Sequence, residues 1–354
     1  MKKQVSIRDV AHEAGVSAAT VSYVLNQTPN ITISPETTIK VREAAERLKY
    51  VPSQAAKTLG SSRLKRSSRS NLIGIVIPQT EQNKYFMFSN PFYGDFLSAV
   101  EYEARKNGYH ILISGVNADQ SYVEIAKARS LDGIVIVGMY PSKDIEEYKK
   151  SGIPAVLVDC YCNNDHFFHS VRTDDRYGGY MATDYLVQKG HRNIAIVSGE
   201  IRENGVNNMR FLGYQDALLE ANIAYNASLV YDGYVGFQYG LEAADKIVNE
   251  NKKRKDKITA VFATSDIVAV GVIKGFQERG MRVPEDYSVI GFDDVYYSQI
   301  CNPSLTTIHQ NIIEKGREAA KIMISAAVNP GLPKRERIIP MELVERQSVR
   351  SLTE

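Results

Sequence analysis

Apolar and polar residues follow two different patterns along this chain. Within the first fifty or so residues, short apolar stripes recur at the spacing of amphipathic helices. From residue 71 onward, compact apolar runs alternate with longer amphipathic stretches, which is typical of buried parallel strands with helices between them. The pattern predicts a helical head at residues 1–52 and an α/β core at residues 71–354, joined by residues 53–70.

Capping residues mark the first two helices that we expect in the head. Ser6 can begin the first helix, with Asp9 at its third position as in a capping box, and Gly15 can end it. Ser17 can then cap a second helix over Ala18–Leu25. Two helices joined by a tight glycine-containing turn, with a third helix packed behind them, form a helix-turn-helix.

The third helix is expected to open at Pro35 after Ser34, because proline suits the first helical position. A helical bundle without a DNA role, in which the serines and threonines serve only as caps, is the alternative to a helix-turn-helix. The residues expected to face inward from the third helix are Ile39, Ala44, Ala45 and Leu48.

In a helix-turn-helix, the second helix enters the major groove and its first residues meet base edges. Ala18 and Ala19 can touch a thymine methyl group, and Tyr23 can hydrogen-bond to a base or a phosphate. Small hydrogen-bond donors around them suit phosphate, which positions a protein without specifying sequence. These donors are Ser17, Thr20, Ser22 and Asn26.

Charge is distributed unevenly along the chain. The whole chain has a net charge of +2, with 43 basic and 41 acidic residues. Residues 1–70 contain 12 of the basic and 5 of the acidic residues, a net of +7, which leaves −5 for the remainder. A basic head on an acidic core suits a head that contacts phosphate. Charge alone leaves a merely solvated basic surface equally open.

Five strings in the head form a specific set of motifs. They are Val5-Ser6-Ile7-Arg8-Asp9-Val10-Ala11, Ala14-Gly15-Val16-Ser17, Thr20-Val21-Ser22, Val24-Leu25-Asn26 and Leu48-Lys49-Tyr50-Val51-Pro52-Ser53. Together they resemble the head of the LacI/GalR (lactose and galactose repressor) family. The resemblance implies DNA binding and adds Ser6 and Ser53 to the DNA-contacting residues. The loop over residues 27–34 is longer than in the best-known members, and Tyr23 stands where they often carry Arg or His, so the operator sequence is not predicted.

The stretch from Ser53 to Leu59 is expected to form a short hinge helix. In the family this helix orders on DNA and places a leucine in the minor groove, and the resemblance assigns that role to Leu59. An apolar wedge of this kind unstacks a base step and bends the duplex. A leucine packed on the core is the alternative.

Residues 60–70 depart from the family, because this link is longer than usual and basic. Its serine and glycine content predicts flexibility. Extra phosphate contacts and a merely soluble linker are both compatible with its composition. The basic residues are Arg63, Lys65, Arg66 and Arg69.

Seven apolar runs in the core are predicted to be strands. They are Leu72–Pro78, Tyr109–Gly115, Gly133–Gly138, Ala155–Asp159, Asn193–Ser198, Ala260–Thr264 and Ser288–Phe292. The helical stretches between them include Phe92–Lys106, Tyr177–Lys189, Asn208–Ala221 and Ile267–Arg279. So many strands are better housed in two parallel sheets than in one, and ligands of such sheets bind beyond the carboxyl ends of the strands.

The family resemblance extends over the core. It rests on Gly190-His191-Arg192-Asn193-Ile194, Arg210-Phe211-Leu212-Gly213-Tyr214, Ala260-Val261-Phe262-Ala263, Val283-Pro284-Glu285-Asp286, Ile290-Gly291-Phe292-Asp293-Asp294 and Pro303-Ser304-Leu305-Thr306-Thr307-Ile308. It implies a core like a periplasmic sugar-binding protein, with two lobes, three crossing strands and a ligand in the cleft. Lobe 1 is expected over about 71–172 and 310–339, and lobe 2 over about 173–309 and 340–354.

Four effector-binding positions carry over from the family to matching residues of this chain. Phe92 and Tyr93 match a ring-stacking position, with helix packing as the alternative. Asp293 matches a position that holds ligand hydroxyls, and Arg210 one that holds a hydroxyl or a charge. Aromatic faces beside carboxylates and an arginine suit a sugar.

Three further residues complete the expected effector site. Asp174 matches an acid of the second lobe at the cleft, and Tyr234 is an additional aromatic candidate. Ser265 is preferred as a ligand contact over its neighbour Asp266, which can serve as a helix cap.

No catalytic, cofactor or metal site is predicted. The sequence lacks a phosphate-binding Gly-Lys-Ser/Thr loop, a dinucleotide glycine fingerprint and a Gly-x-Ser-x-Gly elbow. Cys160, Cys162 and Cys301 form neither a disulfide framework nor a zinc set. Because neither a long apolar run nor a secretory signal is recognised, a cytoplasmic protein without a membrane span is expected.

These features predict a transcription regulator, specifically a dimeric repressor that binds a palindromic operator. A sugar or sugar derivative in the interlobe cleft would switch it. A solute-binding protein without DNA function is a second hypothesis, against which the basic head counts. An α/β enzyme with an accessory head is a third, against which the missing catalytic residues count.

Overall fold

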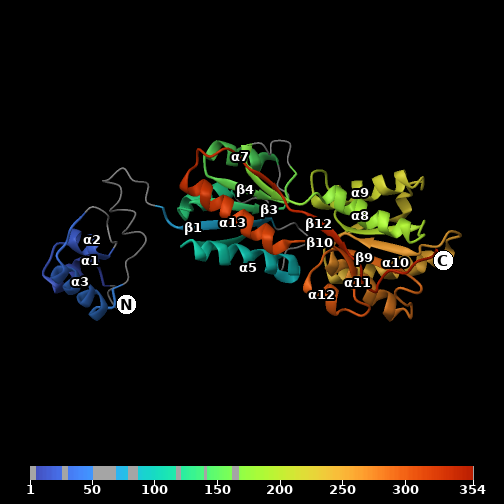
Figure 1. The fold of residues 1–354 in the computed structure, drawn as a ribbon, viewed down its shortest axis with the longest axis horizontal. Coiled ribbons are helices and arrows are strands. Elements are labelled where there is room, and N and C mark those ends of the chain that lie inside the picture. Colours follow the sequence, from blue (N-terminus) through green and yellow to red (C-terminus); the bar gives the residue numbers. More distant parts are fainter. Residues whose placement is uncertain are drawn as a thin grey trace. The chain divides into compact units, whose positions relative to one another are not determined.

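A computed structural model describes residues 5–25, 31–50, 69–78, 87–116, 121–138, 142–161 and 167–353. The chain forms two compact units, residues 1–70 and 71–354 (Figure 1). Among the described residues, no helix is long and apolar enough to cross a membrane.

The head contains the three expected helices, α1 (Ile7–Ala14), α2 (Ala18–Leu25) and α3 (Pro35–Arg47). The capping box of α1 is confirmed, since the Ser6 side chain accepts from the Asp9 amide and Asp9 accepts from the Ser6 amide at 2.7 Å. The turn that follows needs a left-handed residue, and Gly15 supplies it with φ 65°.

One apolar residue from each helix is fully buried at the centre of the head: Val10, Val21 and Val41. The expectation that Ile39 faces inward is wrong, because its side chain is 56% exposed. Ile39 lies only two positions before Val41, which places it on the far side of a helix with 3.6 residues per turn.

The core contains two six-stranded sheets. The first has the order β11-β5-β4-β3-β1-β2, and all its pairs are parallel. Its strands are β1 (Leu72–Pro78), β2 (His110–Val116), β3 (Gly133–Val137), β4 (Ala155–Val158), β5 (His169–Arg172) and β11 (Glu336–Ile338).

The second sheet has the order β12-β10-β9-β8-β6-β7. Its pairs are parallel except that β10 pairs antiparallel with β12. Its strands are β6 (Ile194–Gly199), β7 (Val230–Gly233), β8 (Ala260–Ala263), β9 (Ser288–Asp293), β10 (Thr306–Gln310) and β12 (Met341–Val344). The seven predicted strands are confirmed, and five further strands, β5, β7, β10, β11 and β12, were not anticipated.

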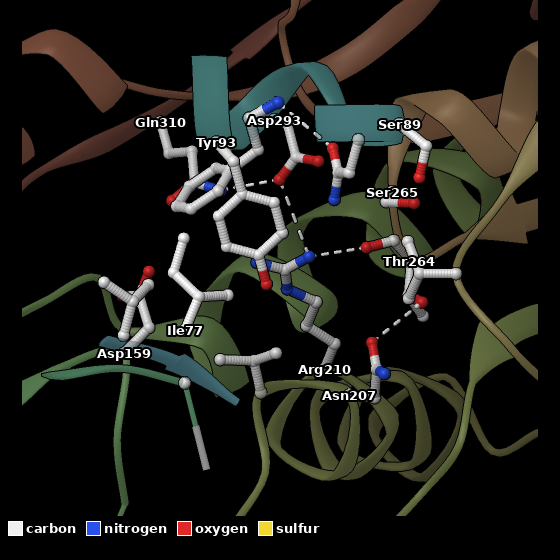
Figure 2. Close-up of a pocket in the computed structure, with 16 residues that line it drawn as sticks. Ile77, Ser89, Tyr93, Asp159, Asn207, Arg210, Thr264, Ser265, Asp293 and Gln310 are labelled. Atoms are coloured by element: carbon white, nitrogen blue, oxygen red, sulfur yellow. Dashed lines mark hydrogen bonds and ion pairs between the residues drawn. The ribbon is translucent and has the colours of Figure 1, made fainter. Parts of the chain in front are cut away.

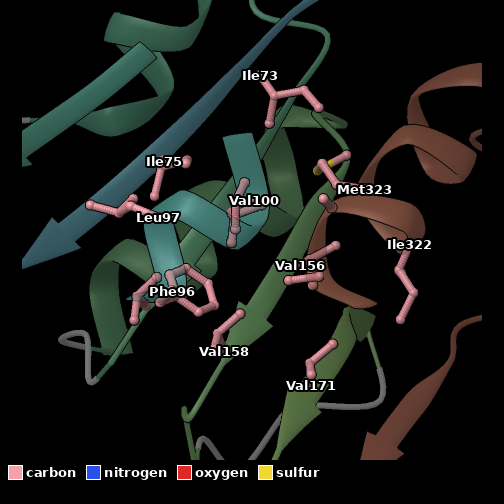
Figure 3. Close-up of a cluster of buried hydrophobic side chains, with 14 of the residues drawn as sticks. Ile73, Ile75, Phe96, Leu97, Val100, Val156, Val158, Val171, Ile322 and Met323 are labelled. Carbon is pink, nitrogen blue, oxygen red and sulfur yellow. The ribbon is translucent and has the colours of Figure 1, made fainter. Parts of the chain in front are cut away.

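Helices cover both faces of each sheet because successive strand residues point to opposite sides. In β3, Val135 packs towards α5 (Pro91–Lys106) and α13 (Ile312–Val328), while Ile134 and Ile136 pack towards α6 (Tyr122–Ala128) and α7 (Ser142–Ser151). Figure 3 shows the first of these clusters, in which Phe96 and Val100 of α5 lie against strand residues such as Val156.

The second sheet is covered in the same way. One face packs on α8 (Asp175–Gln188) and α9 (Val206–Glu220), and the other on α10 (Phe237–Lys253) and α11 (Asp266–Glu278). The remaining elements are short: η2 (Met87–Ser89), η4 (Ala227–Leu229) and α12 (Tyr296–Ile300).

The chain passes between the two sheets three times, after β5, after β10 and between β11 and β12. We call the part around the first sheet, which includes α13, lobe 1, and the part around the second sheet lobe 2. In both lobes the parallel strands have their carboxyl ends on the side that faces the other lobe. The loops that follow these strands therefore border the space between the lobes.

Helices α8 and α9 approach each other unusually closely in lobe 2. A Cβ atom at Gly213 would lie 1.9 Å from the carbonyl oxygen of Arg176, and one at Gly179 would lie 2.2 Å from that of Arg210. Only glycine fits at these two positions, and the close contact brings Arg210 of α9 beside Asp175 at the start of α8.

Candidate functional site

A cavity of about 850 Å³, open to solvent, lies between the two lobes. Small-molecule sites are often found between lobes or domains. Loops and helix starts that follow the carboxyl ends of the parallel strands supply its lining. The lining residues are Ile77, Ser89, Asn90, Phe92, Tyr93, Val137, Gly138, Asp159, Val206, Asn207, Arg210, Val235, Thr264, Ser265, Asp293 and Gln310.

Arg210 occupies the centre of the lobe 2 wall (Figure 2). Its Nη2 lies 2.8 Å from Asp175 Oδ1, and its Nη1 lies 3.7 Å from Asp293 Oδ1 and donates to the carbonyl oxygen of Thr264 at 2.5 Å. The ring centroid of Phe292 lies 3.6 Å from the guanidinium carbon, so the flat face of this group is also covered. Burial alone would lower the pKa of Arg210, but the neighbouring carboxylates raise it, and the side chain is charged.

Asp293 ends β9 with φ 120°, a backbone conformation that L-residues rarely adopt. Its side chain lies at the cavity and accepts a hydrogen bond from Gln310 Nε2 at 2.6 Å. Burial raises the pKa of Asp293 to about 6, against the opposing effect of Arg210. The Asp293 carboxylate can therefore accept hydrogen bonds at the cavity, and Arg210 offsets only part of the cost of burying its charge.

Lys315 lies on α13 immediately behind the lobe 1 wall and is fully buried. Its Nζ donates to both carboxylate oxygens of Asp159, at 2.7 and 2.8 Å, and to Gln310 Oε1 at 2.5 Å. Burial raises the pKa of Asp159, and the attraction of Lys315 opposes this rise. Because Lys315 takes the Gln310 oxygen, the amide nitrogen of Gln310 is left to face Asp293.

The two aromatic residues expected at the cleft both line the cavity. The rings of Phe92 and Tyr93 meet edge to face with their centroids 5.5 Å apart. Burial, with the nearby Asp159 and Asp293 carboxylates, raises the pKa of Tyr93 to about 12, so its hydroxyl keeps its proton. Asn90 caps the helix that carries both rings, accepting from the Phe92 amide at 3.1 Å.

Ser265 also lines the cavity, and its hydroxyl is buried without a hydrogen-bond partner. It begins α11 without making a side-chain cap. The next residue, Asp266, points away from the lining, where its carboxylate accepts from the Thr307 hydroxyl at 2.6 Å and the Val295 amide at 3.0 Å. Buried polar groups are normally paired, so this hydroxyl has unused hydrogen-bonding capacity at the cavity.

Two residues expected at the cleft do not line it. Asp174 is exposed and caps α8, with its carboxylate accepting from the Tyr177 amide at 3.1 Å, and the following residue, Asp175, is the buried partner of Arg210. Tyr234 packs beside Tyr239 outside the lining. A helix cap must turn its side chain towards its own amides, and this geometry removes Asp174 from the cavity.

Several residues in the cavity wall or directly behind it were missed from the sequence. Asp159 stands at the end of a predicted strand, where the rule that ligands bind beyond the carboxyl ends of parallel strands points to it. Lys315 interrupts the apolar face of a helix between Ile312 and Ala319, which is a recognisable signal for a buried cation. Gln310 had no comparable signal, because its strand was not anticipated.

In the head, the start of α2 has the features expected of a DNA-contacting helix. Ser17 Oγ accepts from the Thr20 amide at 3.1 Å, while its hydroxyl lies 2.9 Å from the Thr20 hydroxyl. Ala19 is exposed, and Ala18, Ser22 and Tyr23 are partly exposed. The hydroxyl of Ser6 donates to Asp9 at 2.7 Å, within the cap of α1. Three further predicted DNA contacts, Asn26, Ser53 and Leu59, lie outside the described residues.

Comparisons with known proteins agree with this architecture. Residues 6–53 match the model for bacterial regulatory proteins of the lacI family, and residues 183–349 match the periplasmic binding protein-like domain. The catabolite control protein A of Priestia megaterium is 34% identical over 90% of this chain and 91% of its own length.

Two solved structures are also similar. A Lac repressor dimer bound to operator and the anti-inducer ONPF has a TM-score of 0.82 and 25% identity, over 98% of this chain and all of the repressor chain. A LacI family transcriptional regulator from Enterococcus faecium with bound ribose has a TM-score of 0.69 and 27% identity, over 80% of this chain and all of that one.

These matches decide between the three hypotheses drawn from the sequence. The relatives are transcription regulators and not enzymes, and the match over residues 6–53 makes the head a DNA-binding domain, which a solute-binding protein lacks. The cavity is the ligand site expected of a periplasmic-binding-protein-like core. The chain therefore belongs to the LacI family of bacterial transcription regulators, with a helix-turn-helix head and a two-lobed ligand-binding core.

Proposed function

We propose that this protein is a dimeric repressor that binds a palindromic operator and is switched by a sugar-like effector in the interlobe cavity. The observation that carries the proposal is the cavity itself, in which Arg210 and Asp293 meet beside the rings of Phe92 and Tyr93. A chain with this cavity and a DNA-binding head is suited to couple the binding of a small molecule to the binding of DNA.

The chemistry of the cavity favours a polyhydroxyl ligand. The faces of sugar rings carry C–H groups that pack on aromatic side chains, and their edges carry hydroxyls that bond to carboxylates and amides. Phe92 and Tyr93 supply the first kind of contact, while Asp293, Asn207 and Ser265 supply the second. The ribose bound by the similar Enterococcus faecium regulator supports the same ligand class.

The operator proposal rests on the head. The exposed methyl of Ala19 and the partly exposed Ala18 and Tyr23 would face base edges from α2, with Ser6, Ser17, Thr20 and Ser22 nearer the phosphates. Asn26, Ser53 and Leu59 are proposed contacts from the neighbouring segments. The similar Lac repressor binds its operator as a dimer, and two-fold symmetry in a protein calls for an inverted repeat in its DNA.

The effector would act by its different affinity for two arrangements of the lobes. Asp293 and Arg210 belong to lobe 2, whereas Phe92, Tyr93 and Asp159 belong to lobe 1, so a ligand that contacts both sets favours one arrangement. The lobes connect to the head through the segment before β1, and the protein acts on DNA in the cytoplasm.

Selection of DNA duplexes by the full-length protein tests the operator proposal. We expect enriched sequences to contain an inverted repeat, and gel shift together with light scattering to give two chains per duplex. Selected sequences with a single half-site, bound by a single chain, would contradict the dimeric operator complex.

The effector proposal is tested by a thermal-shift screen of neutral, amino and phosphorylated sugars, because a ligand that binds the folded state raises the unfolding temperature. A sugar that shifts the wild-type protein should also change operator affinity and should fail to shift Asp293→Asn. The matched control is Asp256→Asn, since Asp256 is exposed and outside the cavity lining. If Asp293→Asn keeps the full response, the cavity is not the effector site.

A further inference from the structure

We propose that the cavity selects sugars that carry no negative charge, either neutral or amino sugars, and rejects phosphorylated and carboxylated ones. This inference rests on the proposed function and names the ligand class of the same site. It follows from the way in which the buried cations around the cavity are already used by the protein's own acceptors.

Arg210 already uses its Nε and Nη2 side and a donor of Nη1 for acceptors of the protein itself. Its Nε donates to Asp175 Oδ1 at 2.8 Å, its Nη2 lies at 2.8 Å from the same oxygen, and its Nη1 donates to the carbonyl of Thr264. The ring of Phe292 closes one flat face. A phosphate that paired with the Nε and Nη2 side would displace Asp175 and leave this fully buried carboxylate without its counter-ion.

Lys315 is equally occupied. Its Nζ donates to both oxygens of Asp159 and to Gln310 Oε1, and it lies 3.5 Å from the Thr173 hydroxyl. The side chain is fully buried and does not belong to the cavity lining. Asp159 stands between Lys315 and the cavity, so a ligand meets the carboxylate and not the ammonium group.

The balance of charge around the cavity is negative. Among the described lining residues Arg210 is the single cation, whereas both Asp159 and Asp293 are carboxylates. Asp175 is buried behind the lining and adds to this excess, since with Asp159 and Asp293 it makes three carboxylates beside the two cations Arg210 and Lys315. Asp266 is also buried there, and burial raises its pKa well above the ordinary value.

Helix dipoles offset part of this excess. The starts of α9 and α11 reach the cavity through Asn207 and Ser265. The first turn of α11 already contains the carboxyl of Asp266, which sits where an anion would gain from the dipole. The unpaired hydroxyl of Ser265 is neutral and both donates and accepts, which suits a sugar hydroxyl.

Matched ligand series on the full-length protein test the inference. The series are D-ribose with D-ribose 5-phosphate, and D-glucose with D-glucosamine, D-glucose 6-phosphate and D-gluconate, measured by thermal shift and calorimetry. In a series that contains a binder, the neutral or amino member should bind at least tenfold more tightly than the anionic member. Tighter binding of a phosphate or carboxylate overturns the inference and leaves the sugar proposal standing.

If no sugar of any charge binds, the sugar proposal fails, and titration with inorganic phosphate then tests separately whether the cavity rejects anions. Phosphate that protects the wild-type core, but not a variant with Arg210→Met, would overturn it. If millimolar phosphate, in large excess over the protein, does not raise the unfolding temperature of the wild-type core, the rejection of anions is supported.

Two variants isolate the cause of the selection. Asp159→Asn keeps the shape of the side chain but leaves Lys315 without a carboxylate, so the preference for the uncharged member, or the exclusion of phosphate, should weaken at least tenfold. Asp159→Asn with Lys315→Met removes both charges and should retain the preference. If Asp159→Asn leaves the preference unchanged, buried charge does not set the ligand class. Asp256→Asn is the control, because Asp256 is exposed.

Discussion

The head and the lobe cavity reach their functional geometry by different routes. In the head, the turn that positions α2 depends on residues within a dozen positions of one another, such as the Ser6 cap, Gly15 and Ser17. In the cavity, Arg210, Asp293 and Lys315 come from three separate parts of the chain and meet only when both sheets have formed. A DNA-binding surface can therefore be recognised from local signals, whereas a ligand site depends on long-range packing.

Disrupting the head should have the largest effect and should leave the core unaffected. Val21→Asp places a charge at a fully buried position in the small cluster of the head, which should unfold it and lower operator affinity by at least about 100-fold. Gel shift measures the loss, while calorimetry of the core transition should give the wild-type midpoint. A shift of the core midpoint in Val21→Asp would contradict the view that the head and the core fold independently.

Removing the central cation of the cavity should be the next largest change. Arg210→Met leaves Asp175 and Asp293 buried without their counter-ion, so we expect the free energy of unfolding of the core to fall by about 3–5 kcal/mol. Arg176→Met is the control, because Arg176 and Asp216 form an exposed pair worth at most about 1 kcal/mol. Denaturant titration of both variants gives the difference, and equal losses would contradict the role assigned to Arg210.

Acid should destabilise the core through its buried histidines. Burial lowers the pKa of both His169 and His191 to about 4, so the unfolded chain binds their protons first as the pH falls. Stability is therefore complete above the unfolded pKa of about 6.5 and is lost as the pH falls from there towards 4. Unfolding midpoints measured across this range should show a shallower loss in His191→Gln.

Asp293 gives the opposite pH effect within the same unit. Its pKa, raised to about 6 by burial, means that the folded core takes up its proton before the unfolded chain does. Protonation of this group therefore favours the folded state as the pH falls from 6 towards 4, and Asp293→Asn should make the acid loss steeper. A shallower loss in Asp293→Asn would reverse the sign argued here.

The smallest effects are expected for Asp174, which the sequence predicted at the cleft, and for Ser265, which lines the cavity. Asp174→Asn should change sugar affinity less than about twofold, because asparagine caps helices as well as aspartate does. Ser265→Ala removes an unpartnered hydroxyl, so the stability of the core should stay the same while sugar affinity falls by roughly 2–10-fold. Calorimetric titration distinguishes the two, and a larger loss in Asp174→Asn would restore it to the site.

The strands that the sequence predicted differ from the strands that it missed in their hydrophobic pattern. Most of the seven predicted strands are apolar runs such as Leu72–Pro78, whose side chains are largely buried on both faces, although β2 at the edge of its sheet is partly exposed. The five others are short and contain polar residues, as in His169–Arg172 and Thr306–Gln310. These five strands lie at the ends of the sheets or next to the crossings between the lobes, where polar side chains are common. Hydrophobic patterning therefore does not identify these strands.

The sequence by itself determined the helix-turn-helix head, the α/β class of the core, and the ring and charge residues Phe92, Tyr93, Arg210 and Asp293. Each depends on signals close together in the chain or on a motif typical of the family. Only the tertiary structure decided that Asp175 and not Asp174 pairs with Arg210, and that Lys315 holds Asp159 and Gln310. These choices depend on which way neighbouring side chains point and on contacts more than a hundred residues apart. Local sequence signals do not contain that information.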